Sequence, residues 1–129
     1  MRLLQPVEEL RTGLDYHLAR HNVLAANLAQ VDTPGFRAKD LVRNAEFGAV
    51  LQTEMSATAP GHLGGGTSSV PGTVMADPNA PVGLDGNGVS LEREAVKIAS
   101  NQLRYDALGT CTSTTISDLM WAVNDGRGG

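Results

Sequence analysis

The sequence predicts a mainly α-helical protein whose N- and C-terminal helices pair as an antiparallel coiled-coil hairpin, with a Gly/Pro-rich irregular segment between them. Apolar side chains recur at helical spacing near both ends of the 129-residue chain, whereas glycine and proline crowd its middle. We expect an N-terminal helix in residues 1–31 and a turn motif with a short helical or extended segment in 32–56. A flexible loop in 57–88 and a C-terminal helix and tail in 89–129 complete the chain.

The first helix is predicted from a heptad pattern in residues 10–31. Apolar residues and two histidines alternate at spacings of four and three, which is typical of a coiled-coil seam. The seam positions are Leu10, Leu14, His17, His21, Leu24, Leu28 and Val31. A long helix with one narrow apolar stripe indicates a second helix as its partner.

The end of this helix is marked by a turn signal. Pro34 disfavours the helical conformation at Thr33, and Pro34 followed by Gly35 suits the two central positions of a type II turn. Roughly helical spacing of apolar residues then predicts a short helix over 44–56. Between Pro60 and Gly88 the chain has eight glycines and four prolines, which is typical of a loop.

The C-terminal helix is predicted to begin near Ser90, a favourable N-cap, with Glu92 and Glu94 in the first turn where the helix dipole favours anions. Its apolar face is expected at Leu91, Ala95, Ile98, Ala99, Leu103 and Tyr105. Gly109 and the Thr/Ser-rich residues 110–115 are poor helix formers. The helix is therefore either broken near residue 109 or kept continuous by its neighbours.

Composition and motifs exclude several classes of protein. Ten basic against fourteen acidic residues give a formal net charge of −4, which argues against a non-specific nucleic-acid binder. No stretch has the roughly 18 to 20 apolar residues of a membrane span, and residues 1–17 lack the apolar core of a secretory signal. With 4% aromatic residues a compact enzyme is also disfavoured.

No motif supports catalysis or metal binding. His17 and His21 have metal-ligand spacing but no third ligand, so we interpret them as polar residues that fix the register of the seam, with pH-sensitive packing as an alternative. The loop that starts at Asp85 has calcium-loop character, but Val96 stands at its twelfth position, and we expect a turn there. Cys111 has no neighbouring base. We expect no enzymatic activity, cofactor, metal or small-molecule substrate.

Residues 14–41 contain Ala-Asn-Leu-Ala at 26–29 and Thr-Pro-Gly-Phe at 33–36, and residues 86–108 contain Asn-Gln-Leu-Arg-Tyr at 101–105. These two blocks resemble flagellar basal-body rod proteins of the proximal-rod FlgB type. That family's motif runs Ala-Asn, Ile or Leu, Ala-Asn, two variable residues, Thr-Pro-Gly and an aromatic residue. It is matched at Ala26, Asn27, Leu28, Ala29, Thr33, Pro34, Gly35 and Phe36, with Gln30 where the family usually has its second Asn. Residues 86–108 are similar to the family's C-terminal helix, including its Asn-Gln-Leu-Arg-Tyr segment.

The resemblance implies a non-enzymatic structural subunit of the bacterial flagellar rod. Such proteins polymerise helically as part of the periplasmic drive shaft and export channel, and they are needed for flagellum assembly and motility. They leave the cell through the flagellar type III export apparatus without a cleaved signal peptide. The implied partners are copies of the chain itself, other flagellar rod proteins, the adaptor at the rod base and the export-gate proteins.

The resemblance also suggests roles for individual residues. Within one subunit the two helices are expected to pair through Leu10, Leu14, His17, His21, Leu24, Leu28, Leu91, Ala95, Ile98 and Leu103. Neighbouring subunits are expected to contact Arg20, Asn22, Asn27, Thr33, Pro34, Gly35 and Phe36.

Two other classes of protein share part of this pattern. Another axial protein of the rod and hook family would normally carry a larger folded domain between its helices, and residues 57–88 are too few and too rich in glycine to form one. A coiled-coil adaptor or chaperone of a type III secretion system would share the helices but would not need the turn motif after Val31.

Overall fold

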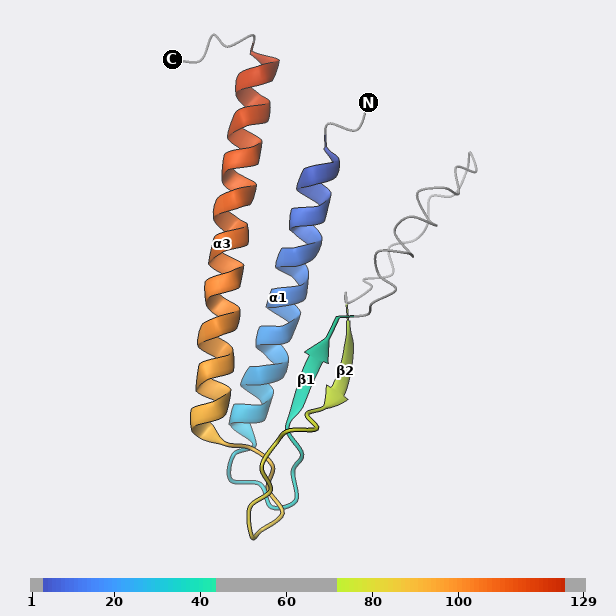
Figure 1. The fold of residues 1–129 in the computed structure, drawn as a ribbon, viewed down its shortest axis with the longest axis vertical. Coiled ribbons are helices and arrows are strands. Elements are labelled where there is room, and N and C mark those ends of the chain that lie inside the picture. The colour runs from blue at the N-terminus through green and yellow to red at the C-terminus, as the bar shows by residue number, and fades with distance from the viewer. Residues whose placement is uncertain (1–3, 44–71, 125–129) are drawn as a thin grey trace, which may run out of the picture.

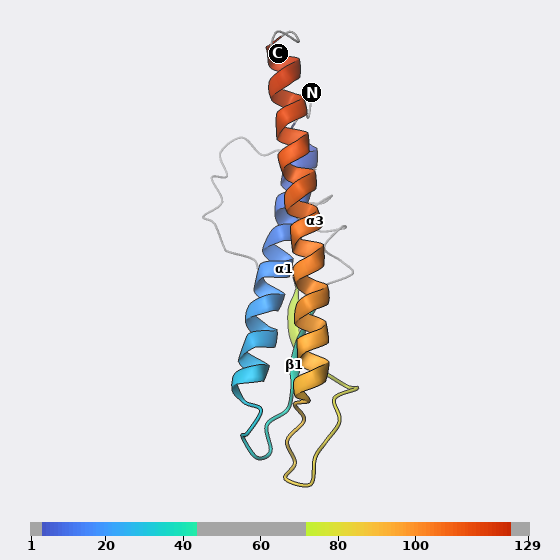
Figure 2. The same ribbon diagram turned by 90° about the vertical axis from the view of Figure 1, so that its left-hand side faces the viewer.

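The computed structural model describes residues 4–43 and 72–124. They form helix α1 (Gln5–Ala29), strand β1 (Lys39–Val42), strand β2 (Thr73–Ala76) and helix α3 (Leu91–Val123). The two helices lie side by side along the length of α1, the last turns of α3 extend beyond it, and β1 lies beside the lower part of α1 (Figures 1 and 2). Within these stretches neither helix combines the length and the hydropathy that a membrane span requires. The expected short helix at 44–56 and the first part of the expected loop, 57–71, lie outside the described residues.

Helix α1 has Pro6 in its first turn, where a missing backbone N–H costs nothing. After Ala29 the chain makes the expected turn. Gly35 has a φ of +74°, and the backbone N–H of Phe36 donates to the carbonyl of Thr33 at 3.3 Å. A positive φ at this position and a bond between residues three apart are the features of the predicted type II turn.

The two-stranded sheet was not expected, because residues 73–76 fall in the segment predicted to be a loop. Strands β1 and β2 are antiparallel, with Lys39 opposite Ala76 and Val42 opposite Thr73. One residue beyond the paired residues, the N–H of Asp77 donates to the carbonyl of Ala38 at 2.8 Å. Backbone pairing between segments far apart in the chain therefore overrides the local preference of a Gly/Pro-rich region for loop structure.

Helix α3 begins after Ser90, whose hydroxyl accepts a hydrogen bond from the N–H of Arg93 at 3.4 Å, so the predicted N-cap is confirmed. The helix continues unbroken through Gly109 to Val123, so the expected alternative of a break near residue 109 is wrong. The hydroxyls of Thr110 and Thr112 donate to the carbonyls of the residues four before them. These side chains are satisfied within the helix and do not interrupt it.

The buried core is small and largely polar. Among the described residues, the buried apolar side chains are Leu24, Ala38 and Leu41, and the buried polar ones are His17, Asn27, Asn87, Glu94 and Asn101. Most of them come from the end of α1, the start of α3 and the chain that leads into β1. The tightest packing therefore lies where the helices meet the sheet.

Helix α3 turns a different face toward α1 from the one expected. Leu91 and Leu103 are 55% and 71% exposed, and Ala95 is exposed as well, whereas Ile98 is half-buried. The buried side of α3 carries Glu94 and Asn101, one heptad apart. The expectation followed the apolar residues, but hydrogen bonds from α1 orient the helix. On α1 the expected seam holds better, with Leu24 and His17 buried and Leu10, Leu14, His21 and Leu28 half-buried.

Candidate functional site

A reciprocal pair of hydrogen bonds sets the register of the two helices. The side-chain amide of Asn101 donates to the backbone carbonyl of His17 at 2.7 Å, and its Oδ1 lies 2.8 Å from Nδ1 of the His17 ring. Since the amide nitrogen is the donor of the first bond, Oδ1 is the acceptor of the second and Nδ1 of His17 carries the proton. Farther along, Gly13 faces Leu108, whose Cδ1 lies only 3.0 Å from where a Cβ would stand.

Asn27 joins three elements at the other end of α1. Its amide nitrogen donates to the carbonyl of Lys39 at 2.6 Å and to Oε2 of Glu94 at 2.9 Å, and its Oδ1 accepts from the N–H of Lys39 at 2.9 Å. The buried side chain of Asn27 thus satisfies the backbone N–H and carbonyl at the start of β1 and one oxygen of the buried Glu94 carboxylate on α3.

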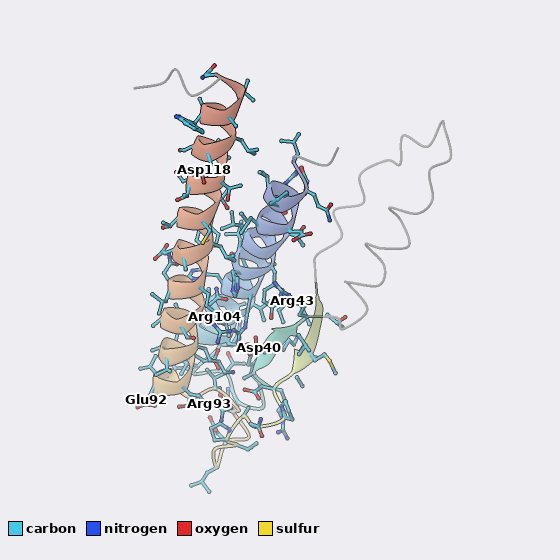
Figure 3. All side chains as sticks on the ribbon, turned by 45° about the horizontal axis from the view of Figure 1, so that its top comes forward. Asp40, Arg43, Glu92, Arg93, Arg104 and Asp118 are labelled. Atoms are coloured by element: carbon cyan, nitrogen blue, oxygen red, sulfur yellow. The ribbon has the colours of Figure 1, made fainter. Side chains whose placement is uncertain are left out.

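Six charged side chains surround this point, and we call them the charged junction: Arg20, Asp40, Asp77, Arg93, Glu94 and Lys97. Arg20 donates two hydrogen bonds to the carboxylate of Asp40, at 2.7 and 2.8 Å. Lys97 reaches Asp77 at 2.6 Å, Glu94 at 3.2 Å and Asp40 at 3.8 Å. Figure 3 shows Asp40 and Arg93 at the sheet end of the molecule, whereas Asp118 lies near the opposite end of α3.

The partners of Asp40, Asp77 and Lys97 in the junction shift the pKa values of these three groups toward their ionised forms. Burial alone would raise the pKa of Asp40, but the hydrogen bonds and charge of Arg20 outweigh burial and bring that pKa below its ordinary value. For Asp77, burial is likewise outweighed, mainly by the hydrogen bond from Lys97, so its pKa is also lowered. Burial would lower the pKa of Lys97, but its bond to Asp77 and the charge of Glu94 raise it. Three positive and three negative groups therefore form a balanced set.

A second polar centre fixes the turn after α1 to the start of α3. The amide nitrogen of Asn87 donates to the carbonyls of Gln30, Val31 and Thr33 at 2.7 to 3.0 Å. Backbone bonds from Gly35 to Asp85 and from Gly88 to Phe36 flank it. The turn motif is therefore fastened within its own subunit.

The residues expected to contact neighbouring subunits fall into two groups. Asn27 is buried and Arg20 is engaged with Asp40, so both serve the interior of this chain; this corrects the expectation that they face outward. The exposed members are Asn22, Thr33, Pro34 and Gly35, and Phe36 is half-buried. The first two lie inward because their polar groups have partners on β1 and α3 that helical periodicity alone does not reveal.

The outward face of α3 carries an apolar stripe. Leu91, Ala95, Ala99 and Leu103 follow one another at intervals of four and are all exposed, and Val96 beside them is 69% exposed. Residues four apart in a helix share one side. The stripe contains four of the six residues of the apolar face predicted from the sequence, and it is open to solvent in the single chain, whereas Ile98 and Tyr105 are half-buried.

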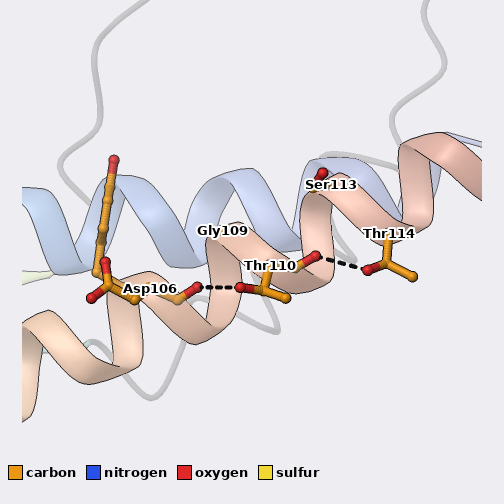
Figure 4. A pocket seen from close by; sticks show the side chains of 6 residues that line it. Asp106, Gly109, Thr110, Ser113 and Thr114 are labelled. Carbon is orange, nitrogen blue, oxygen red and sulfur yellow. Dashed lines mark hydrogen bonds between the residues drawn. The ribbon is translucent and has the colours of Figure 1, made fainter.

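The remaining features offer no chemical site in the described part of the chain. A shallow hollow on α3 is lined by Tyr105, Asp106, Gly109, Thr110, Ser113 and Thr114, all from one helix (Figure 4). Two of its threonines donate to carbonyls of the same helix. Residues 4–43 and 72–124 contain no group of three His, Cys, Asp or Glu side chains placed to hold a metal, and Cys111 is an exposed free thiol.

Glu94, Asn101 and Asn87 were not singled out as site residues from the sequence. The sequence pattern places Glu94 in the first turn of the C-terminal helix, and Asn87 lies in the turn expected to start at Asp85. A signal was present on α3, because Glu94, Asn101 and Leu108 are spaced by seven residues and so lie along one seam. A polar heptad is not recognised when only apolar spacing is followed.

Comparison with known proteins gives a consistent result. The chain matches no family model. It is similar to the flagellar basal body rod protein FlgB of Escherichia coli (strain K12), with 32% identity over 124 residues that cover 89% of this chain and 90% of the relative. The protein of the same name from Cereibacter sphaeroides is 33% identical over 110 residues, covering 81% and 82%. That from Yersinia enterocolitica is 28% identical over 124 residues, covering 88% and 90%.

Proposed function

The chain belongs to the FlgB family of flagellar basal body rod proteins, and from this premise we propose how it is built into the rod. It is a non-enzymatic structural subunit of the proximal rod, which polymerises helically as part of the periplasmic drive shaft and export channel. Its partners are copies of itself, other rod proteins, the adaptor at the rod base and the export-gate proteins. It reaches the rod through the flagellar type III export apparatus.

Within the subunit, α1 and α3 act as an antiparallel coiled coil. The order of their contacts supports this arrangement, because residues 13, 17 and 27 of α1 meet residues 108, 101 and 94 of α3 in turn. The view in Figure 1 agrees, since α1 ends and α3 begins at the same end of the molecule. Hydrogen bonds set the register of the pair, and the half-buried apolar residues of α1 fill the space between them.

The observation that carries the assembly role is the apolar stripe on α3. A helix that meets its intramolecular partner through Glu94 and Asn101 while it exposes leucines and alanines on another face has a second face to bury. The two small residues in the middle of the stripe, Ala95 and Ala99, allow a neighbouring helix to approach closely. We assign the stripe to packing against a helix of the next rod subunit, together with Asn22 and the exposed turn Thr33, Pro34 and Gly35.

A charge on the stripe tests the proposal. Leu103→Glu should leave the isolated chain as helical as the wild type, because Leu103 is 71% exposed, but it should abolish motility and incorporation into basal bodies. Ser100→Glu places the same charge on another exposed position of α3 and should swim normally. Circular dichroism, swimming assays and electron microscopy of purified basal bodies read the outcome. Normal rods that contain Leu103→Glu would refute the interface, and absence of the wild-type chain from the rod would refute the function.

A further inference from the structure

The two-stranded sheet is held on the helix pair mainly by polar groups. Of its residues, Leu41 is buried, whereas Val42, Val74 and Met75 are about half exposed. Ala38, just before β1, adds one small buried side chain. Such a small apolar contact contributes little of the free energy that keeps the sheet in place.

The polar contacts of the sheet, by contrast, are numerous and charged. Asp40 of β1 is bound by Arg20 of α1, and Asp77 after β2 is bound by Lys97 and Arg93 of α3. Neutral bonds from Tyr16 to the carbonyl of Leu41 and between Asn27 and Lys39 accompany them. Hydrogen bonds to charged groups are roughly twice as strong as neutral ones, and they depend on both partners keeping their charge.

The contacts that join the middle of the two helices use none of the charged side chains of the junction. His17 and Asn101 bond directly to each other, and Leu108 packs onto Gly13. The two sets of contacts meet around Asn27 and Glu94 and at Tyr16, whose hydroxyl donates to the carbonyl of Leu41 and whose ring lies edge-on to the ring of His17. Loss of the charged junction therefore removes the ion pairs that hold the sheet and leaves the bonds between His17 and Asn101 and the contact between Gly13 and Leu108 in place.

We propose that the β1–β2 sheet is a releasable element, which the charged junction centred on Lys97 locks onto the helix pair and which detaches as a unit while the helix pair stays formed. Detachment would expose Leu41 on the sheet. Release of the sheet is a property of the single folded chain, so this proposal does not depend on the proposed packing of the apolar stripe of α3 against a neighbouring subunit.

Removal of the central cation is the direct test. Lys97→Met keeps the length of the side chain and deletes its charge, and Lys39→Met makes the same change at an exposed lysine of β1. In the full-length monomer, native-state amide exchange of β1 and β2 should be about tenfold faster or more in Lys97→Met, because charged bonds are lost. Amides of α1 and α3 near His17 and Asn101 should change by less than about twofold, and Lys39→Met should match the wild type. Equal acceleration in sheet and helices, or none in either, would overturn the proposal.

A charge reversal keeps the test decisive if Lys97→Met does not fold. Asp40→Arg places a cation against Arg20 and Lys97 and should release the sheet. Arg20→Asp combined with Asp40→Arg restores the opposite charges and should bring the sheet back onto the helix pair.

Acid titration of the wild type gives a third test of the proposal. The charged or titratable groups around Asp40 and Asp77 are Tyr16, Arg20, Arg93, Glu94 and Lys97. Methyl NMR signals of Leu41 and Val42 should shift at a higher pH than those of Leu108, and coincident shifts would contradict separate release.

Discussion

The amide of Asn27 donates a hydrogen bond to Oε2 of Glu94 over 2.9 Å, and each side chain is 1% exposed. The other oxygen of this carboxylate accepts from Lys97 at 3.2 Å. A buried carboxylate is tolerated only when both its charge and its lone pairs are satisfied, and here α1 and α3 supply the two donors. The pair therefore ties the end of one helix to the start of the other.

Asn27→Asp should be among the most damaging conservative changes in the chain. It replaces the donor facing Glu94 with a second carboxylate and also removes the bond to the carbonyl of Lys39. We expect the free energy of unfolding to fall by about 3 kcal/mol or more, measured by urea denaturation. Asn22→Asp makes the same change at an exposed position of α1 and should stay within about 0.5 kcal/mol of wild type. Equal stability of the two variants would contradict the buried bond.

Asn101→Ala should loosen the register of the helices. The change leaves the carbonyl of His17 and its ring Nδ1–H without their partner in a buried site, which costs about 1 to 3 kcal/mol. Ser100→Ala, next to it on the exposed side, serves as the control. Thermal unfolding of both proteins gives the comparison. A melting temperature of Asn101→Ala equal to that of the control would show that the bond pair does not fix the helices.

Stability should decline in acid because of the charged junction. The pKa values of Asp40 and Asp77 lie below the ordinary value of 3.8. A carboxyl group with a lowered pKa stabilises the fold above its unfolded pKa, and that contribution is lost as the pH falls through the folded pKa. The pKa shift of Lys97 has the opposite sign, because its pKa is raised above 10.5. Its contribution to the stability of the fold is therefore complete below that value and is lost as the pH rises through the folded pKa.

Urea denaturation across this pH range checks the signs. The free energy of unfolding should be level near neutrality and should decline below about pH 4. Asp77→Asn should flatten the acid decline, whereas Asp118→Asn, at an exposed site on α3, should leave its shape unchanged. An acid decline as steep in Asp77→Asn as in the wild type would show that other carboxyl groups cause it.

Gly35 should resist substitution because of its backbone and not because of crowding. Its φ is +74°, and no atom lies within 4 Å of a Cβ built there. A β-branched residue is strongly disfavoured in this conformation, whereas asparagine tolerates it better. Gly35→Val should lower the free energy of unfolding by about 1 to 2 kcal/mol and block rod assembly with export intact, and Gly35→Asn should be milder in both. Normal motility of Gly35→Val would contradict the role of the turn.

The sequence predicted both helices, the Ser90 cap and the turn at Gly35, since each depends on residues close together in the chain. It did not predict which side of α3 meets α1. The apolar pattern marks a face that is buried somewhere, but in the single chain Leu91 and Leu103 are exposed and Glu94 and Asn101 face inward. The partners of these two lie 67 and 84 residues away, beyond the reach of local spacing. The sheet was missed for a related reason, since the exposed β2 shows no alternation of buried and exposed residues.

The two glycines of the helix pair should respond differently to alanine. Gly109 lies within α3 with no atom within 4 Å of a Cβ, so Gly109→Ala removes the entropic cost of glycine without a clash. The free energy of unfolding should rise by about 0.5 to 1 kcal/mol. At Gly13 a Cβ would meet Cδ1 of Leu108 at 3.0 Å, so the leucine must be displaced, and this cost offsets the entropic gain of replacing glycine. Gly13→Ala should therefore stabilise the chain less than Gly109→Ala, or destabilise it. Urea denaturation of both variants decides the point. A larger gain at Gly13 than at Gly109 would mean that the helices do not approach each other there as closely as the contact between Leu108 and Gly13 requires.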